Sequence, residues 1–369
     1  INITVEEKPT GEIMAGAGVG TGGGTVAFGV SENNFLGSGK QLSVGINRST
    51  YQESVNLSFT EPYFTVDGVS VGYSIFARET DYDQINVSSF STNAKGANVN
   101  WGYPISEVER VGFGVGFENL DIRYGAYASQ EIRNFIDTNG SKFDVFNLNL
   151  NWRKSTLNRG MFATRGASQR LALNVALPGS GLEYYKATYK GQYLRGLTRS
   201  LSLKLRADLG YGESYGDTSQ LPFFKNFYGG GFGSVRGFES NSLGPQDTPC
   251  YSATEDCNNQ SAYNRPDPIG GNVQIEFGSE VIFPMPFVKD KRSMQSAFFI
   301  DAGNIFNTKC GDTQLNCFKP DVGELRYSVG VGVTWLSAMG PLTFSYAKPL
   351  NSSEYDETEN FQFSLGNQF

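Results

Sequence analysis

Phe361-Gln-Phe363-Ser-Leu365-Gly366-Asn-Gln-Phe369 is the last stretch of the chain, and it decides the fold class. Apolar side chains stand at every second position as far as Leu365, and the final residue is aromatic. Because alternate residues of a strand share one face, this segment predicts a strand with one apolar face and one polar face. A bare apolar strand edge invites aggregation in water, whereas a membrane barrel pairs its last strand with its first and turns the apolar face to lipid. We therefore expect an all-β transmembrane barrel that closes through this strand.

The composition of the 369-residue chain agrees with many strands joined by tight turns. Gly accounts for 45 residues and aromatic residues for 14% of the chain, whereas charged residues make up only 18%. The mean hydropathy is −0.33, and no run of about 18 apolar residues occurs, which excludes a helical membrane protein. A barrel stays possible, because only alternate residues of its strands face lipid.

The charged and reactive residues exclude several classes of function. The net charge is −7 without a basic block, which argues against nucleic acid as a partner. The chain has no His, so His-based triads, His general bases and His metal ligands are absent. No Ser stands in a nucleophile-elbow context either. We predict no catalytic residue, no metal site and no cofactor, and hence a protein that is not an enzyme.

Strand patterns recur along the whole chain. The clearest runs from Leu201 to Tyr211, where one face is wholly apolar and the other includes Lys204, Arg206 and Asp208. In a sandwich the apolar face would meet a second sheet; in a barrel it meets lipid, and the charges line a wet lumen. Sixteen such runs, an even number as expected for an antiparallel barrel, predict strands at 11–20, 23–31, 40–49, 51–60, 67–79, 92–103, 109–120, 142–153, 166–177, 182–194, 199–212, 271–283, 295–306, 325–336, 341–348 and 360–369.

The start of the chain and its cysteines bear on export. The chain begins INITVEEKPT without Met or a signal peptide, so we expect residues 1–10 to be the remnant of a preceding periplasmic domain and 11–369 to be the barrel. The four cysteines form two local pairs, Cys250/Cys257 and Cys310/Cys317, in polar segments. Six intervening residues fit a metal site poorly, so we predict two short-loop disulfides, which require an oxidising compartment.

The stretch from Glu213 to Gly270 is too long for an ordinary loop and predicts a functional loop folded into or over the barrel. It contains a Gly-rich run that continues into Val235-Arg236-Gly237-Phe238. A phosphate-binding loop would require a following helix, which the sequence does not predict.

This motif resembles the signature loop of the outer-membrane barrel-assembly family. The resemblance covers residues 11–369, and its further motifs occur in the family's order: Phe64-Thr-Val-Asp67-Gly-Val69-Ser, Pro178-Gly-Ser-x-x-Glu183-Tyr-Tyr185-Lys, Asn226-Phe-Tyr-x-Gly-Gly, Gly244-Pro245, Gly270-Gly271-Asn and Gly340-Pro341-Leu-x-Phe344-Ser-Tyr346-Ala-x-Pro349. The resemblance implies that the long loop enters the lumen and that Arg236 pairs there with acidic residues. Alternation places Glu280 on the polar face of its strand, and Asp301 would be costly on the lipid side. By motif match these two are the expected partners; alternatively, they are ordinary lumen-lining charges.

The first strand is predicted to make a weak closing seam. Its apolar face holds Ile13, Ala15, Ala17 and Val19, and its other face is dominated by Gly16, Gly18 and Gly20. Small side chains give little cross-strand packing. The resemblance implies that this seam with Phe361, Phe363, Leu365, Gly366 and Phe369 is a lateral gate, to which a client strand adds. Alternatively, the glycines only permit curvature.

The implied function is folding and insertion of β-barrel proteins at the outer membrane of a Gram-negative bacterium. The implied partners are unfolded outer-membrane clients, outer-membrane lipid and the accessory lipoproteins of an assembly complex. The alternative is a secretion pore of the same superfamily that exports an unfolded client through the lumen. A passive porin would need an open channel, which the long loop is expected to plug.

Overall fold

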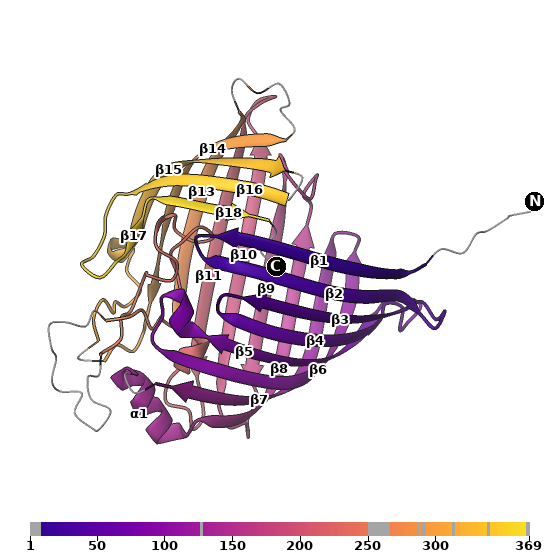
Figure 1. The fold of residues 1–369 in the computed structure, drawn as a ribbon, viewed down its shortest axis with the longest axis horizontal. Helices are drawn as coiled ribbons and strands as arrows, with labels where there is room; N and C mark the ends of the chain where they lie inside the picture. The colour runs from indigo at the N-terminus through magenta and orange to yellow at the C-terminus, as the bar shows by residue number, and fades with distance from the viewer. Residues whose placement is uncertain are drawn as a thin grey trace, which may run out of the picture.

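The chain folds into one closed antiparallel barrel of sixteen strands (Figure 1). The computed structural model describes residues 9–125, 128–249, 266–285, 288, 293–311, 314–337 and 340–366. Each barrel strand pairs with its neighbour in the chain, and the first strand pairs with the last. The predicted fold class is therefore confirmed.

The sixteen barrel strands coincide closely with the sixteen predicted from alternation. They are β1 (Gly11–Gly20), β2 (Gly23–Phe35), β3 (Lys40–Ser49), β4 (Gln52–Glu61), β5 (Ser70–Asp81), β6 (Phe90–Ser106), β7 (Glu109–Tyr124), β8 (Lys142–Ser155), β9 (Gly166–Ala176), β10 (Tyr184–Gly196), β11 (Ser202–Ser214), β13 (Val273–Pro284), β14 (Met294–Phe306), β15 (Arg326–Ser337), β16 (Gly340–Pro349) and β18 (Phe361–Leu365).

The alternation of side chains separates an apolar outer face from a polar inner face. In β14, Phe298 and Ile300 are more than half exposed, whereas the residue that follows each of them, Phe299 and Asp301, is buried. The same two-residue period recurs in β7, where Phe113, Val115 and Phe117 are the exposed positions. An exposed apolar band outside and buried charges inside are the pattern of a barrel that sits in lipid.

A few short elements lie outside the barrel wall and were not predicted. Helix α1 (Gln130–Asn139) lies between β7 and β8. Its Phe135 is buried in an apolar cluster that includes Phe143 of β8. Two-residue strands β12 (Gly237–Phe238) and β17 (Thr358–Glu359) pair with each other. Among the described residues, no helix is long and apolar enough to span a membrane. The 3-10 helices are η1 (Tyr82–Ile85), η2 (Phe223–Lys225) and η3 (Val322–Glu324).

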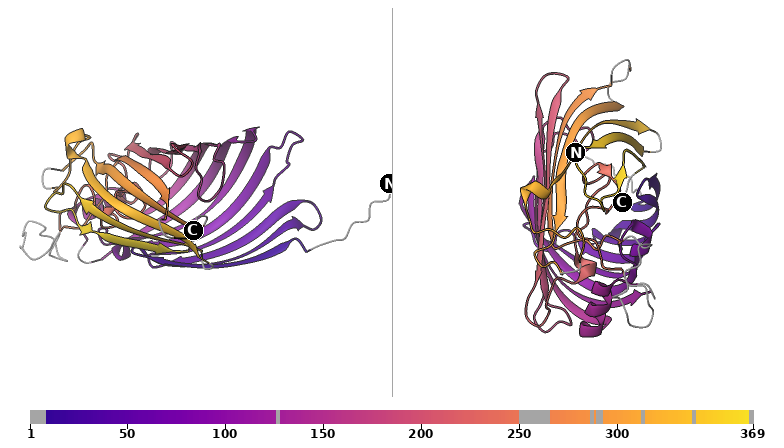
Figure 2. Two further views of the ribbon diagram at one scale, coloured as in Figure 1. Left: turned by 90° about the horizontal axis from the view of Figure 1, so that it is seen from above. Right: turned by 90° about the vertical axis from the view of Figure 1, so that its left-hand side faces the viewer.

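The long connection between β11 and β13 packs against the inward faces of the strands. Phe223 and Phe224 from its first part lie in one buried cluster with Phe90 of β6 and Phe135 of α1, and the rings of Phe90 and Phe223 meet edge to face at 4.7 Å. In the right-hand view of Figure 2, this connection lies inside the outline of the strands. Its first part thus shares a buried apolar cluster with β6 and α1.

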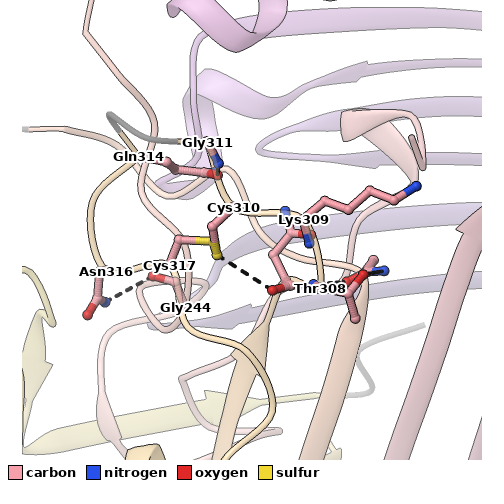
Figure 3. The surroundings of a disulfide bond; sticks show 10 residues. Gly244, Thr308, Lys309, Cys310, Gly311, Gln314, Asn316 and Cys317 are labelled. Carbon is pink, nitrogen blue, oxygen red and sulfur yellow. Dashed lines mark hydrogen bonds between the residues drawn. A yellow bond between two sulfur atoms is a disulfide. The ribbon is translucent and has the colours of Figure 1, made fainter. Parts of the chain in front are cut away.

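A disulfide closes the connection between β14 and β15. Cys310 and Cys317 are bonded, with their Cα atoms 5.8 Å apart (Figure 3). Within the enclosed segment, the side-chain amide of Asn316 donates to the carbonyl of Gly244 at 3.0 Å. The predicted Cys310–Cys317 bridge is therefore confirmed, and it holds its loop against the long connection. The predicted Cys250–Cys257 bridge lies outside the described residues.

Candidate functional site

The closing seam between β1 and β18 is short. Within the described residues the two strands pair only at Val19↔Leu365 and Gly20↔Ser364, and the amide of Thr21 donates to the carbonyl of Phe363 at 3.0 Å. On its other side, β1 pairs with β2 along its whole length, from Gly11↔Glu32 to Gly20↔Gly23. Figure 1 shows β1 and β18 side by side at this edge. The barrel is therefore closed by its smallest described ladder.

The structure gives the register of this seam, which the sequence left open. Phe363 lies opposite Thr21, beyond the end of β1. Ile13, Ala15, Gly16, Ala17 and Gly18 have no ladder partner among the described residues of β18, whereas Phe361 and Phe363 pair with β16. Side-chain alternation determines which face each residue takes but not how far two strands are offset along each other, so the sequence alone did not give this register. Phe369 lies outside the described residues.

Gly366 lets the end of the chain approach β1 closely. Its φ is +86°, and a Cβ atom built on it would lie 2.5 Å from the carbonyl oxygen of Ala17. Only glycine tolerates both this backbone conformation and this approach. The predicted seam residues Ala17 and Gly366 are therefore brought together, by backbone contact and not by side-chain packing.

Arg236 is held by both of the acidic residues expected from the sequence. Its Nε and Nη2 donate to the two carboxylate oxygens of Asp301, at 2.7 and 3.0 Å, and its Nη2 lies 2.9 Å from Glu280 Oε1. The guanidinium also lies over the ring of Phe299, 3.4 Å from its centroid. Fork-like pairing of this kind is strong and directional, and stacking on an aromatic face adds to it.

Burial decides the electrostatics of this pair. The side chain of Asp301 is 0% exposed and that of Arg236 only 12%. Burial by itself lowers the pKa of Arg236, but the hydrogen bonds and charge of Asp301 and Glu280 outweigh it, so the net shift of the pKa is upward. A buried charge of either sign without its partner would be costly. The loop is therefore anchored at one point by charges that depend on each other.

The rest of the motif fits closely around this anchor. Val235 and Phe238 are fully buried and pack together with Leu243. Gly237 has a φ of +94°, and a Cβ atom there would lie 3.2 Å from that of Ala347 in β16. The motif therefore needs a glycine at this position, because an L-residue would be strained and crowded.

Several residues of the site were not identified from the sequence as partners of this loop. Arg206 of β11 donates to the backbone carbonyls of Gly233 and Ser234. The hydroxyl of Ser234 donates to the buried carboxylate of Glu276 in β13. Alternation did place Arg206 on the inner face, but no pattern within the loop indicates which carbonyl meets which strand. Across the described part of the chain, no group of three or more Cys, Asp or Glu side chains is arranged to hold a metal ion.

A closed antiparallel barrel with an apolar outer face and a short closing seam defines a β-barrel of the membrane-embedded kind. The chain belongs to the Omp85 superfamily, whose domain matches residues 34–369.

Relatives from several lineages align with the whole chain. It is 35% identical to the outer membrane protein assembly factor BamA of Neisseria meningitidis, over 100% of this chain and 48% of that protein. It is 23% identical to a SAM50-like protein of Schizosaccharomyces pombe, over 100% of this chain and 74% of that protein. The chain thus spans about half the length of the bacterial relatives it matches.

Solved structures show the same fold. The crystal structure of BamA from Haemophilus ducreyi lacking POTRA domains 1–3 superposes with a TM-score of 0.88 at 30% identity, over 98% of this chain and 71% of that one. CdiB from Acinetobacter baumannii superposes with a TM-score of 0.57 at 13% identity, over 97% of this chain and 60% of that one. The second likeness extends to the fold alone.

Proposed function

We propose that this barrel catalyses the folding and insertion of β-barrel proteins into the outer membrane, through a lateral gate between β1 and β18. The single observation that supports this function best is the seam itself, in which the described parts of β1 and β18 pair only at Val19↔Leu365 and Gly20↔Ser364. Assembly-factor relatives that align over the full chain favour the same function.

The proposed mechanism makes and breaks no covalent bond. Unpaired backbone groups in lipid cost several kcal/mol each, which is why a lone client strand does not enter the membrane. If β1 separates from β18, its free edge offers hydrogen-bond partners to a client strand, which adds by β-augmentation. The client's own strand pairing and apolar burial then supply the free energy of insertion.

The location and the partners follow from the same considerations. The closed sixteen-stranded barrel is a protein of the bacterial outer membrane, with lipid against its apolar outer face. As partners we propose unfolded outer-membrane clients and the accessory lipoproteins of an assembly complex. We also propose that residues 1–10 continue from a periplasmic domain, since the bacterial relatives are about twice as long as this chain.

The seam can be tested by locking it. Gly20 and Ser364 lie opposite each other, and paired residues of a ladder lie within the Cα separation that a disulfide needs. The double variant Gly20→Cys/Ser364→Cys should close the seam. A matched control, Thr343→Cys/Ser364→Cys, joins β18 to β16 instead and leaves the β1–β18 seam free to open. Both proteins are reconstituted at full length in vesicles, and client insertion is followed by protease protection.

We expect oxidation of the seam variant to abolish insertion, reduction to restore it, and the control to remain active in both states. Full insertion by the locked seam would refute gating here and would favour the secretion-pore alternative, in which the client passes through the lumen. Loss of insertion in the oxidised control as well would mean that β18 must also part from β16, and would refute a gate confined to the β1–β18 seam.

A further inference from the structure

We propose that Gln362 couples the loop in the lumen to the seam strand, so that release of the Arg236 anchor and loosening of β18 are one event. The role of this coupling rests on the proposed function: it would hold the seam closed until a client binds. The coupling itself is a property of the described hydrogen bonds.

Gln362 is the second residue of β18, and its side chain is buried inside the barrel wall. Its side chain is 0% exposed, and its Nε2 donates to the backbone carbonyl of Phe238 at 2.8 Å and to Glu359 Oε2 at 3.2 Å. Both partners are acceptors, which fixes the orientation of the amide. Its Oε1 is buried without a hydrogen-bond partner among the described residues. A buried polar side chain that leaves one atom unsatisfied is costly, so its presence calls for a reason other than packing.

Phe238, which accepts this bond, belongs to the anchored motif. It follows Arg236 by two residues and is itself fully buried. The segment also pairs with the chain just before β18, through Gly237↔Glu359 and Phe238↔Thr358, and the amide of Glu239 donates to the carbonyl of Glu357 at 2.9 Å. The loop and the approach to β18 therefore form a small sheet of their own, inside the barrel wall.

The anchor and the seam strand are thus connected through a few short steps. Asp301 and Glu280 fix Arg236, the backbone leads from Arg236 to Phe238, and Phe238 binds Gln362. On the seam side, the described ladder joins β18 to β1 at Val19 and Gly20, and the amide of Thr21 adds a hydrogen bond to Phe363. Between the β1–β2 turn and the loop lies a cavity of about 750 Å³, lined in part by Thr21, Gly23, Ser240 and Glu359. The inner side of the seam is therefore held by the loop at β18 and borders open space beside β1.

The test compares a variant of Gln362 with its direct cross-strand neighbour. Gln362→Met keeps an unbranched side chain of similar length but cannot donate, and Gln362→Asn keeps the amide but shortens its reach. The matched control is Ser345→Ala in β16, because Ser345 lies opposite Gln362, is buried and has no hydrogen-bond partner in the described structure. Hydrogen–deuterium exchange of the full-length protein in vesicles, without any client, reports the opening of β18.

We expect both Gln362 variants to raise the exchange rate of β18 by about 3- to 10-fold, the range that one net hydrogen bond supplies. Ser345→Ala should change it less than about 2-fold. Combined with Arg236→Ala, in which the loop is already released, Gln362→Met should add less than about 2-fold, because coupled sites are not additive.

Full additivity of the two substitutions, or an equal effect of Ser345→Ala, would overturn the coupling. Since exchange is measured without a client, a failure of the coupling is distinguishable from a failure of the proposed function, which only the insertion assay reports.

Discussion

Two seams of this barrel contain glycine-rich strands, yet they differ greatly in extent. β6 and β7 pair from Phe90↔Tyr124 to Ser106↔Glu109, with one irregularity near the turn. β1 and β18 pair at Val19↔Leu365 and Gly20↔Ser364 in the described structure. Glycine content therefore does not by itself make a seam weak, because β7 has a glycine at 112, 114 and 116.

The difference lies in what covers the glycines. A Cβ atom on Gly114 would lie 2.2 Å from Oδ1 of Asn100, and one on Gly116 would lie 2.1 Å from Oδ1 of Asn98. In β7 the absent side chains thus make room for asparagines of β6 that lie across the ladder. Cross-strand side-chain pairs are the unit of sheet stabilisation. A seam is weak where few residues pair, and in the described structure this holds for β1 and β18.

The largest loss of stability should come from Arg236→Ala, and it should affect the β1–β18 seam much more than the β6–β7 seam. Removing one partner of a buried ion pair leaves Asp301 with only the more distant guanidinium of Arg206, 3.9 Å away, and costs about 3–5 kcal/mol. Because the loop is bonded to Phe238 and β18, we expect faster hydrogen exchange in residues 234–239 and at the β1–β18 seam, with little change in β6 and β7. The barrel should still form.

Arg48→Ala is the control for this experiment. Arg48 pairs with Glu53 at 3.0 Å, but both side chains are mostly exposed, so the loss should be under about 1 kcal/mol. Equal exchange changes in both seams after Arg236→Ala would show that the anchor stabilises the whole barrel and not the seam.

A second predicted effect is a pH-dependent loss of stability beside the β6–β7 seam. Asp247 of the long loop accepts from the hydroxyl of Ser88, just before β6, at 2.6 Å and from the amide of Asp267 at 2.9 Å. Burial raises the pKa of Asp247 to about 7, and the nearby charges of Asp267 and Glu131 also raise it. The folded loop therefore keeps a proton that the unfolded loop releases near pH 4.

The stabilisation from this proton is complete below about pH 4 and is lost as pH rises through 7. Between pH 5 and pH 8 the contact beside β6 should weaken by roughly 2–3 kcal/mol, at about 1.4 kcal/mol per pH unit below the folded pKa. Limited proteolysis or exchange of residues 245–249 measures this. Asp247→Asn should remove the pH dependence, and a variant that keeps the same slope would assign the dependence to another group.

Removing the Cys310–Cys317 disulfide should destabilise its loop by a free energy similar to, or smaller than, the pH effect at Asp247. In the loop-entropy model, closing a ring this short stabilises by about 2–3 kcal/mol. Cys310→Ser should loosen the contact between Asn316 and Gly244, and exchange in residues 243–246 should rise. Intact mass measured before and after reduction should rise by two hydrogen atoms for each bridge. A rise of only two hydrogen atoms in total would show that the predicted Cys250–Cys257 bridge does not form.

Most of the wall was predictable from the sequence because lipid on one side and water on the other impose a strict two-residue period. Alternation in β11 placed Arg206 on the polar inner face, and the cost of a charge in lipid placed Asp301 of β14 there. Glu280 and Asp301 were named as partners of Arg236 through the family resemblance, and the structure has all three in contact.

The elements that alternation cannot encode were missed. α1 is a single short helix in a loop, and the two-residue pairing of β12 with β17 depends on where the loop lies in the lumen. The register of the seam was left open by the sequence, and in the structure Phe363 lies opposite Thr21. Periodicity determines which face a residue takes, whereas register and loop docking depend on contacts between residues far apart in sequence.

The smallest effect is expected from single methyl groups, and it tests the comparison of glycines directly. A Cβ atom on Gly96 of β6 would lie 2.3 Å from the carbonyl oxygen of Phe117 and 2.8 Å from the ring of Phe76, whereas one on Gly45 of β3 would meet nothing within 4 Å. Gly96→Ala should therefore lower barrel stability by about 1–3 kcal/mol through overpacking. Gly45→Ala should raise it by about 0.4–1 kcal/mol, because alanine reduces the entropy of the unfolded chain. Urea unfolding midpoints in vesicles compare the two. If both substitutions stabilise the barrel, close packing over glycine is not what holds the β6–β7 seam together, and the contrast with β1 and β18 would have to rest on ladder length alone.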